Sequence, residues 1–423
     1  MLDAKKRYPS KCCLIYDNGL FCELAPLLAK DFGRVYYVTP RSDPAFARSN
    51  AELIGHGLEG VTRINDIWRV EKEVDLWVFP DTYDGDLQVH LRDLGHRVFG
   101  SFMGEDLELD RDHAKKFLKS LGMDIGPYKV VKGMGNLRSY LKVHDDQWIK
   151  TSRTRGDFES FHSPNYKIIE PRLDALEHDI GAKKKFYEFI VEDAINDACE
   201  ICFDAYTIDG QYPTQGLCGL EIKDKGYIGI FQKYEQMPNQ IRETNALIAP
   251  ILKNYGYKNF FGLEMRITKN GRAYIIDPLA RFGSPPSELA QLEYTNLAEI
   301  IWEGADGKIV DPTPKGKWGA ELLIHSSFAD KNWVAVHFPP EIRDHVKLRN
   351  CVVIDNTYFC APQAVGLPEI GAVVDVGNTM EEAIKNVTEK AEQVEGYYIE
   401  VFPESLDEAN QEIEKLEGFG IKL

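Results

Sequence analysis

Apolar and polar positions follow two different periods along the opening quarter of the chain. Short apolar runs typical of strands alternate with segments in which apolar residues recur at helical spacing. The predicted strands are Cys12–Tyr16, Arg34–Thr39, Asp75–Phe79 and Val98–Gly100, and the predicted helices are Leu20–Ala29 and Leu87–Leu94. This alternation is typical of a parallel sheet with covering helices. The loop Asp17-Asn18-Gly19 follows the first strand, where open α/β sheets bind ligands, but it lacks the glycine-rich pattern of a dinucleotide site.

The rest of the chain mixes helices and strands without a regular alternation. We predict helices at Leu109–Leu121, Met134–Val143, Ala182–Phe189, Asn239–Tyr255 and Ser287–Trp302, and strands at Tyr128–Val131, Trp148–Thr151, Ile190–Ala194, Glu200–Ile208 and Ile228–Gln232. Asp311–Gly319 contains two prolines and reads as a linker. Beyond it we predict an antiparallel sheet of Ala320–Ser326, Val334–Phe338, Cys351–Phe359 and Val373–Val376, then helix Thr379–Val394, strand Tyr397–Val401 and helix Leu406–Leu416.

A β-hairpin is predicted from Phe261 to Leu279, because the turn Lys269-Asn270-Gly271-Arg272 separates two apolar runs. Counting back from this turn places Glu264 and Asp277 opposite each other, where side chains lie about 5 Å apart. Two carboxylates at that distance repel each other unless a cation lies between them, and paired hard oxygen ligands suit Mg²⁺. A surface hairpin with a cross-strand charge cluster is the alternative for this segment taken alone.

Composition and charge exclude several classes of protein. The 423 residues carry a formal net charge of −17, which argues against general binding to nucleic acid or to a membrane surface. No apolar run is long enough to span a bilayer, and the first residues lack the apolar core of an export signal, so we expect a cytoplasmic protein. The CxxC of Cys199 and Cys202 lies in an apolar, strand-like run with no second pair. We therefore expect buried thiols there instead of a zinc or redox site.

Four stretches carry charged residues in a consistent order. They are VFGSFMGEDLELDRDHAKKFLKSLGM (98–123), DDQWIKTSRTRG (145–156), FIVEDAI (189–195) and the hairpin with its continuation, GLEMRIT (262–268) and IIDPLARFGSPPSE (275–288). Together they resemble the ATP-grasp enzymes, most closely the phosphoribosylamine–glycine ligase branch. The resemblance runs from about Val98 to about Glu392. Taken singly, Lys115 fits a solvated helix face and Glu192-Asp193 an acidic turn, and it is their shared order and spacing that favours a functional interpretation.

The resemblance implies a role for each of these stretches. Lys115 and Lys150 would bind the nucleotide phosphates, and the loop that ends in Gly156 would cover them. Glu192, Asp193 and Ala194 would form the hinge that reads adenine, with Glu200 near the ribose. Glu264 and Asp277 would hold Mg²⁺ or Mn²⁺. The arginines would contact the acyl phosphate or the acid: Arg281 foremost, with Arg266, Arg153 and Arg155 as further candidates.

The chain also departs from the family pattern. Leu279 replaces the usual asparagine and cannot bind a metal, which leaves three interpretations: one metal site is weakened, another residue such as Glu264 compensates, or nucleotide binds without turnover. Ser284 and Pro286 replace an aspartate and a glutamate, and Glu288 is a candidate for the same space. The segment 221–238 and the loop after the first strand lack the expected glycines. The last two of these changes fall where phosphoribosylamine and glycine would bind, so they indicate a substrate other than those of phosphoribosylamine–glycine ligase itself.

The resemblance implies an α/β and α+β fold: a Rossmann-like domain (residues 1–107), an ATP-grasp domain of two α+β subdomains (108–190 and 191–312) and a small α+β domain (313–423). The expected activity is ATP- and Mg²⁺-dependent ligation of a small carboxylic acid to an amine or thiol through an acyl phosphate. A kinase or phosphotransferase, and a nucleotide-binding protein with weakened catalysis, are the alternatives. Small-molecule substrates and a possible homodimer are the expected partners.

Overall fold

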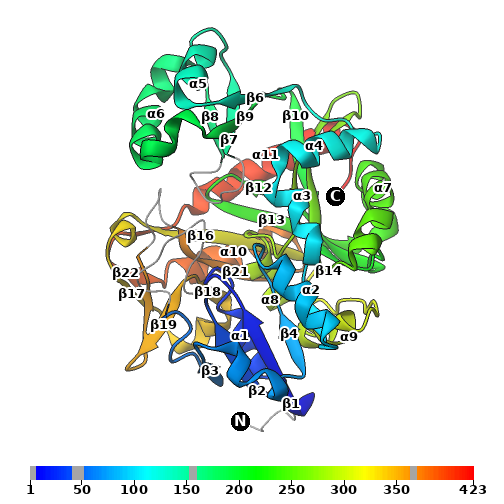
Figure 1. The fold of residues 1–423 in the computed structure, drawn as a ribbon, viewed down its shortest axis with the longest axis vertical. Helices are drawn as coiled ribbons and strands as arrows, with labels where there is room; N and C mark the ends of the chain where they lie inside the picture. The colour runs from blue at the N-terminus through cyan, green and yellow to red at the C-terminus, as the bar shows by residue number, and fades with distance from the viewer. Residues whose placement is uncertain (1–5, 41–51, 152–159, 363–368) are drawn as a thin grey trace.

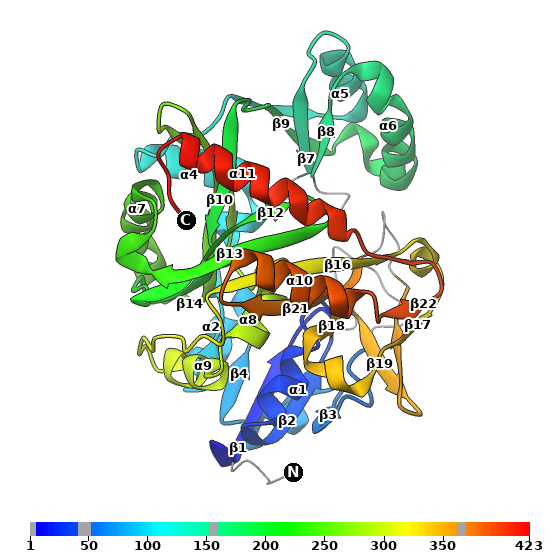
Figure 2. The same cartoon turned by 180° about the vertical axis from the view of Figure 1, so that it is seen from behind.

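The structure is a computed structural model that describes residues 6–40, 52–151, 160–362 and 369–423. Figure 1 shows an amino-terminal sheet at the bottom, a small sheet with its own helices at the top, and a large sheet between them. Seen from behind in Figure 2, the carboxy-terminal helix crosses the large sheet and returns the chain towards the top of the molecule.

The amino-terminal sheet is parallel throughout and has the strand order β3-β2-β1-β4-β5. Its elements are β1 (Tyr8–Tyr16), α1 (Leu24–Ala29), β2 (Phe32–Val38), β3 (Val61–Arg63), β4 (Leu76–Val78), α2 (Gly85–Asp93) and β5 (Val98–Phe99). Cys13, Leu14 and Ile15 in β1 are fully buried, as expected for a strand that is covered on both faces. The predicted α/β beginning of the chain is confirmed. The strand order reverses at β1 and β4, so the loops after these strands form the edge where such sheets bind ligands.

This edge lies against two later parts of the chain. The Asp17 carboxylate accepts a hydrogen bond from the Gly19 N–H at 3.0 Å and so holds the loop after β1. The Gly19 carbonyl in turn accepts from the Asn350 N–H, and the Pro80 carbonyl after β4 accepts from the Phe282 N–H. The edge of the first sheet therefore meets the segment that follows the predicted hairpin.

The small sheet has the order β6-β9-β7-β8 and its own hydrophobic core. Its elements are β6 (Tyr128–Lys132), α5 (Met134–Leu141), β7 (Gln147–Thr151), β8 (Ser160–Ser163), α6 (Tyr166–Ile180) and β9 (Glu188–Asp193). The predicted helix at Ala182–Phe189 is wrong. Gly181, with φ of 55°, ends α6, and a short 3-10 turn leads directly into β9. Phe189 is fully buried between β6 and β7, so strand pairing overrides the local preference.

The large sheet contains ten strands, in the order β11-β14-β10-β12-β13-β16-β21-β18, with β15 paired to β14 and β23 to β16. The strands are β10 (Ala198–Phe203), β11 (Ala205–Ile208), β12 (Gln215–Ile222), β13 (Gly226–Lys233), β14 (Lys258–Thr268), β15 (Ala273–Leu279), β16 (Trp318–Ser326), β18 (Val346–Leu348), β21 (Glu369–Gly377) and β23 (Ile399–Glu400). Around it lie α3 (Asp106–Leu109), α4 (Arg111–Ser120), α7 (Asn239–Tyr255), α8 (Ser287–Glu293), α9 (Leu297–Ala305), α10 (Met380–Ala391) and α11 (Leu406–Gly418). A further sheet of β17 (Val334–His337), β19 (Cys351–Ile354), β20 (Thr357–Cys360) and β22 (Glu395–Gly396) lies beside it.

The large sheet continues across the predicted boundary at residue 312, because β16 pairs antiparallel with β13 from Trp318↔Ile230 to Leu322↔Gly226. The predicted boundary at residue 190 falls inside β9. The mixed α/β character with several sheets agrees with the predicted fold class, while these two boundaries do not coincide with breaks between sheets.

Three of the predicted elements are each divided into two in the structure. The strand predicted at Glu200–Ile208 is broken at Asp204 into β10 and β11, and the one at Cys351–Phe359 is the hairpin β19–β20, which turns at Asp355 and Asn356 with positive φ. The helix predicted at Ser287–Trp302 is two helices, α8 and α9. The break lies where Tyr294 forms a β-bridge with Pro314, so docking of the linker interrupts the helix.

One face of the large sheet carries a row of charged side chains. Register pairs Glu200 with Arg266 and Tyr227 with Glu321, and the pairing of β10 with β12 places Glu221 next to Glu200. Gly219 lies under the Tyr227 ring, where a Cβ atom would lie 2.3 Å from the hydroxyl oxygen, so only glycine fits there. We call this surface the carboxylate face.

The cysteine side chains and the lengths of the helices bear on two further predictions. All eight cysteines are buried and none forms a disulfide, which confirms that Cys199 and Cys202 are core thiols. Among the described residues, no helix combines the length and apolar character that crossing a bilayer requires.

Candidate active site

Four buried charged side chains and one partly buried carboxylate, from four elements, meet at the junction of the small and large sheets. We call them the lysine cluster; its members are Arg111 and Lys115 on α4, Lys150 on β7, Glu192 on β9 and Asp277 on β15. Lys115 Nζ lies 2.7 Å from Glu192 Oε1, and Lys150 Nζ lies 3.2 Å from Glu192 Oε2. Lys150 also pairs with Asp277 at 2.7 Å, and Arg111 lies 3.5 Å from the same carboxylate. The structure therefore brings together four residues that the sequence predicted for the site.

A β-bulge supplies a backbone acceptor to both lysines. Glu264 pairs with Asp277 across the hairpin, but Met265 pairs with Ile275, so Ile276 is the extra residue in β15. Its carbonyl accepts hydrogen bonds from Lys115 Nζ at 3.1 Å and from Lys150 Nζ at 3.5 Å. The bulge thus adds an acceptor beside the two lysine ammonium groups.

Arg111 is a member of the cluster that the sequence argument missed. It precedes Lys115 by one helical turn, and its guanidinium also donates to the Thr151 carbonyl. One face of α4 is buried and carries Arg111, Lys115 and Leu118. This face therefore presents two cations followed by an apolar residue. The i, i+4 spacing of these two cations on the helix face that also carries Leu118 was the available signal.

Burial and neighbouring charges set the protonation of the lysine cluster. Burial dominates for Lys115 and lowers its pKa despite the Glu192 carboxylate. Burial also acts on Lys150, but the Asp277 and Glu192 carboxylates outweigh it and raise its pKa. The pKa of Asp277 is lowered, because Lys150 and Arg111 overcome the effect of burial. The cluster therefore holds three cations against two carboxylates in a site where water is scarce.

The predicted pairing of Glu264 with Asp277 is confirmed by the strand register. Burial, followed by repulsion from Glu200 and Asp277, raises the pKa of Glu264 well above its ordinary value. Glu221 also contributes to this repulsion, and burial together with Glu221 raises the pKa of Glu200 to about 7. A divalent cation at Glu264 would relieve this repulsion.

The donor set fits a magnesium site that is completed by its ligand. Among the described residues, no group of three or more aspartate, glutamate, histidine or cysteine side chains is placed to hold a metal ion. Glu264 and Asp277 offer two hard oxygen ligands, and Mg²⁺ commonly binds one or two carboxylates together with substrate phosphates. Asp277 is already paired with Lys150, so a metal would share that carboxylate with the lysine cluster.

The predicted arginines lie at different places around this centre. Arg281 Nε donates to Glu108 Oε1 at 2.8 Å, and its Nη1 donates to the Phe282 carbonyl. Arg266 lies across the sheet from Glu200 and donates to the Ala198 carbonyl at 3.2 Å. Both arginines are therefore bonded to protein groups in this structure.

The predicted hinge residues have backbone groups that are already occupied. The Asp193 N–H donates to the Pro127 carbonyl and the Ala194 N–H to the Asp146 carbonyl, both at 3.1 Å. These donors are not available to a base edge in this structure. The Glu192 side chain points into the lysine cluster, so its contacts are with the lysines and not with a hinge ligand. Arg153, Arg155 and Gly156 lie outside the described residues.

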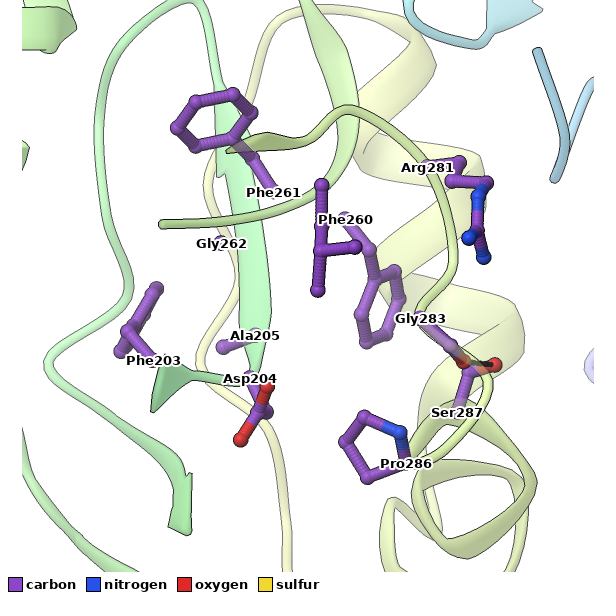
Figure 3. Close-up of a pocket in the computed structure, with 11 residues that line it drawn as sticks. Phe203, Asp204, Ala205, Phe260, Phe261, Gly262, Arg281, Gly283, Pro286 and Ser287 are labelled. Carbon is purple, nitrogen blue, oxygen red and sulfur yellow. Dashed lines mark hydrogen bonds between the residues drawn. The ribbon is translucent and has the colours of Figure 1, made fainter. Parts of the chain in front are cut away.

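Leu279 lines a small pocket that adjoins the hairpin. Figure 3 shows Phe260, Phe261 and Arg281 around this pocket. Phe260 and Phe261 form apolar walls, and Arg281 lies at the rim. The Asp204 carboxylate also borders the pocket. It accepts from Tyr227 Oη at 2.6 Å, and burial raises its pKa to about 7. Leu279, which the sequence resemblance matched to an asparagine, is therefore part of an apolar wall.

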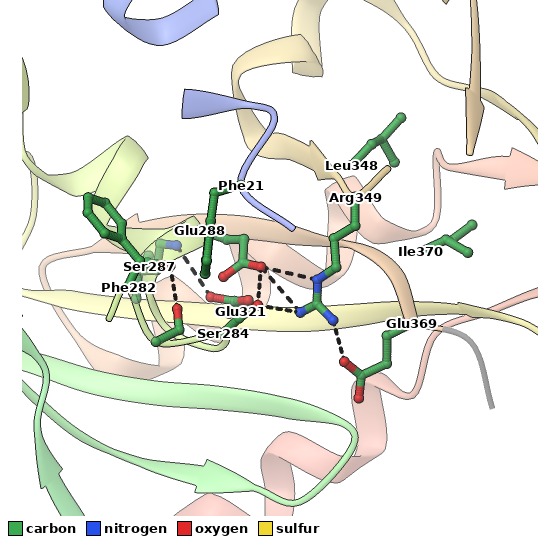
Figure 4. A network of polar contacts seen from close by, with 12 residues as sticks. Phe21, Phe282, Ser284, Ser287, Glu288, Glu321, Leu348, Arg349, Glu369 and Ile370 are labelled. Atoms are coloured by element: carbon green, nitrogen blue, oxygen red, sulfur yellow. Dashed lines mark hydrogen bonds and ion pairs between the residues drawn. The ribbon is translucent and has the colours of Figure 1, made fainter. Parts of the chain in front are cut away.

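A second buried polar network surrounds Arg349, which the sequence argument did not single out (Figure 4). We call it the Arg349 network; its members are Ser284, Glu288, Glu321, Arg349 and Glu369. Arg349 Nη2 lies 3.2 Å from Glu288 and donates to Ser284 Oγ at 2.7 Å, and Nη1 pairs with Glu369. Ser284 also donates to Glu288, so Glu288 does lie beside the changed turn that follows the hairpin.

Comparison of the sequence with known proteins finds no matching family model and no matching curated protein. Comparison of the structure finds similar solved structures over nearly the whole chain. Phosphoribosylamine–glycine ligase from Thermotoga maritima has a TM-score of 0.64 and 16% identity, and the match covers 92% of this chain and 98% of that one.

Two further solved structures share the arrangement. The biotin carboxylase domain of 2-oxoglutarate carboxylase from Hydrogenobacter thermophilus, a dimer in complex with MgADP, ADP and bicarbonate, has a TM-score of 0.64 and 11% identity over 92% of this chain and 91% of that one. N5-carboxyaminoimidazole synthetase from Staphylococcus aureus, in complex with ADP, has a TM-score of 0.60 and 12% identity, and the match covers 92% of this chain and 98% of that one.

Proposed function

We propose that this chain, which has the fold of the ATP-grasp enzymes, is an ATP-dependent ligase that joins a small carboxylic acid to an amine. The ATP-grasp fold predicted from the sequence motifs is confirmed. The proposal about activity rests on one observation: the lysine cluster holds three buried cations against two carboxylates, at the position where the fold brings the small and large sheets together.

The lysine cluster suits the phosphates of ATP. A buried excess of positive charge is costly unless an anion joins it, and a polyphosphate supplies that anion. Lys115 and Lys150 would contact phosphate oxygens, displacing part of their pairing with Glu192. The residues 152–156, which include Gly156 and Arg153, would cover the phosphates. Adenine would lie near Asp193 and Ala194, with Glu200 towards the ribose.

Glu264 and Asp277 would hold Mg²⁺, or Mn²⁺ in its place. The ion would neutralise charge on the phosphates and relieve the repulsion between the two carboxylates. ATP would then phosphorylate the carboxylic acid, and an amine would displace phosphate from the acyl phosphate. Arg281 would stabilise that intermediate, and Arg266 and Arg153 would contact phosphate or acid. Positioning and electrostatics would supply most of the rate enhancement.

The proposed organisation keeps the predicted domains, with the Rossmann-like domain at residues 1–107, the subdomains at 108–190 and 191–312 and the last domain at 313–423. A thiol is the alternative nucleophile, and a homodimer is the proposed assembly. Neither nucleic acid nor a membrane is a proposed partner, because a chain with a net charge of −17 repels anionic surfaces.

The position of the transferred oxygen tests the ligase mechanism. The purified protein is screened against amino acids and small acids for release of ADP. An active acid is then labelled with ¹⁸O in its carboxylate. Ligation through an acyl phosphate transfers one labelled oxygen to the released phosphate. ADP release without that transfer would contradict the proposal.

A second candidate, a nucleotide-binding protein with weakened catalysis, is favoured by Leu279. This side chain forms an apolar wall where a metal ligand would otherwise extend. That candidate predicts binding of ATP by calorimetry with no release of ADP on addition of any acid. A kinase, the remaining alternative, predicts a stable phosphorylated product.

A further inference from the structure

The hairpin places an apolar position directly beside its two carboxylates. Asp277 and Leu279 are two residues apart in β15, so their side chains point to the same face of the sheet. Their cross-strand partners are Glu264 and Gly262 in β14. The Gly262–Leu279 pair therefore follows the Glu264–Asp277 pair along the strands, about 7 Å further on.

Gly262 explains why a pocket forms next to Leu279. A Cβ atom on Gly262 would lie 2.7 Å from Cys202 Sγ and 2.8 Å from the Phe203 carbonyl oxygen, so no side chain has room there. Two side chains normally fill the space between opposite residues of an antiparallel pair. Here Leu279 faces a glycine, and it borders the small pocket together with Phe260.

The pocket has apolar walls and a cation at its rim (Figure 3). Four lining residues are at most 4% exposed: Phe203, Ala205, Phe260 and Phe261. Arg281 is held in place because its Nε donates to Glu108 Oε1 at 2.8 Å. A carboxylate that pairs with Arg281 would therefore place its carbon chain against apolar side chains.

The polar groups in the lining have protein partners. The Asp204 carboxyl accepts from Tyr227 Oη at 2.6 Å, and burial raises its pKa to about 7, so it is only partly ionised at neutral pH. Ser287 Oγ donates to the Gly283 carbonyl. A charged group that entered the pocket would lose its hydration and gain little in return.

We propose that this pocket binds the carbon chain of the carboxylic acid, and that the acid is a short aliphatic monocarboxylate. The inference rests on the proposed function and names the class of its acid substrate. The carboxylate would meet Arg281, and the chain would lie against Leu279 beside the Glu264–Asp277 pair. Because the pocket is small, it takes a chain of few carbon atoms. Leu279 is then a specificity residue.

Propionate and glycine form a matched pair of probes. They have equal numbers of heavy atoms, but propionate carries a methyl group where glycine carries an ammonium group. Saturation-transfer NMR with the full chain measures the dissociation constant of each acid and the protons that contact the protein. We expect propionate to bind at least about tenfold more tightly, because an ammonium loses its hydration in an apolar pocket. The methyl protons of propionate should receive more saturation than its methylene protons.

Chain length gives a second measurement. Each buried methylene strengthens binding about fourfold, so propionate should bind about fourfold more tightly than acetate. The gain should stop at the length that fills the pocket. Leu279→Ala enlarges the pocket and should move that limit to a longer acid. An unchanged limit in Leu279→Ala would contradict the contact with Leu279.

A polar substitution separates the chemistry of the wall from its size. Leu279→Asn keeps a side chain of similar size and should abolish the preference for propionate over glycine. Leu247→Asn is the matched control, because Leu247 is 42% exposed on α7 and is not among the residues that line the pocket. It should keep the preference. Leu279 is partly exposed, so both of its variants are expected to fold, which circular dichroism verifies.

Three outcomes would overturn the proposal. Glycine that binds as tightly as propionate would show that the pocket does not select an apolar group. A preference for propionate that survives in both Leu279→Asn and Leu279→Ala would place the acid elsewhere. Absence of binding by acetate, propionate and butyrate, both with and without MgADP, would contradict the site itself.

The ¹⁸O measurement separates failure of this inference from failure of the proposed function. A chain that transfers labelled oxygen from an acid with a second charged group, but not from propionate, would refute the pocket and leave the ligase intact. Binding of propionate that depends on Leu279, with no release of ADP in the presence of any amine, would support the pocket and contradict the ligase.

Discussion

The lysine cluster and the Arg349 network both gather charged groups from several elements, but they differ in how those groups are paired. The first holds Arg111, Lys115 and Lys150 against two carboxylates, and a buried excess of positive charge calls for an anion. In the second, Arg349 is bonded to Ser284, Glu288 and Glu369, and burial raises the pKa of Glu321, so protein groups and a proton meet these charges. The comparison teaches that a buried site indicates the sign of a ligand only where its own groups leave one charge in excess.

The largest effect is expected from removing a cation of the lysine cluster, which the comparison identifies as the anion-binding site. Lys150→Met leaves Asp277 and Glu192 with less positive charge and removes a phosphate contact. We expect release of ADP to fall by more than about a thousandfold, since a contact to transferring phosphate contributes several kcal/mol. Lys132→Met is the control, because Lys132 is exposed and pairs with Glu188 in the same small sheet. Equal losses in both variants would argue against a specific role.

A substitution in the hairpin separates metal binding from phosphate binding. Asp277→Asn removes a charged metal ligand while it keeps the size of the side chain. We expect turnover to fall by more than about a hundredfold, with a higher requirement for Mg²⁺. A titration of activity against Mg²⁺ measures both effects. Activity that is retained at the original Mg²⁺ requirement would mean that the metal is held by other groups.

In the Arg349 network the corresponding change affects stability. Arg349→Met leaves Glu288 and Glu369 buried without their shared cation, and we expect the free energy of unfolding to fall by about 3–5 kcal/mol. Urea unfolding monitored by circular dichroism measures this loss. Arg69→Met serves as the control, since the Arg69 side chain is 85% exposed and should change stability by less than about 0.5 kcal/mol. A loss below about 1 kcal/mol for Arg349→Met would show that the three carboxyls are compensated in another way.

The smallest expected effect concerns pH. Burial and the neighbouring Glu288 raise the pKa of Glu321 well above its ordinary value of 4.5. The folded chain therefore keeps a proton that the unfolded chain releases, and stability falls as pH rises from the ordinary value towards the folded one. Glu321→Gln cannot lose a proton, so its advantage in free energy of unfolding over the unsubstituted chain should grow as pH rises. Unfolding curves between pH 5 and pH 8 measure this; an advantage that is constant with pH would contradict the shift.

Local patterns were sufficient to predict several elements of this fold. The Asn-Gly turn fixed the hairpin register, so Glu264 and Asp277 are opposite each other as the spacing predicted. Helix α7 has the predicted bounds, because its apolar periodicity is long and Gly256 ends it. The parallel beginning of the chain also follows from its alternating periods. In each case the signal lies within one or two consecutive elements.

Features that depend on distant contacts were missed. The segment Ala182–Phe189 has a locally helical pattern, so its own sequence did not indicate a strand. Phe189 lies in a strand because it is buried between β6 and β7. Arg349 lies 61 residues from Glu288 in sequence, so no spacing rule joins them. No spacing rule joins Glu192 to its two lysine partners either, because those lysines come from α4 and β7. Charged residues of a buried network become recognisable only after the sheets are assembled.

The continuity of the large sheet has a practical consequence for any attempt to shorten the chain. A chain that ended at residue 312 would lack β16 and leave β13, an eight-residue strand, with an open edge. It would also lack α11, which packs on β10, β12 and β13. Exposed strand edges of this length pair with other chains. Truncation there would therefore yield aggregates in place of a minimal catalytic fragment.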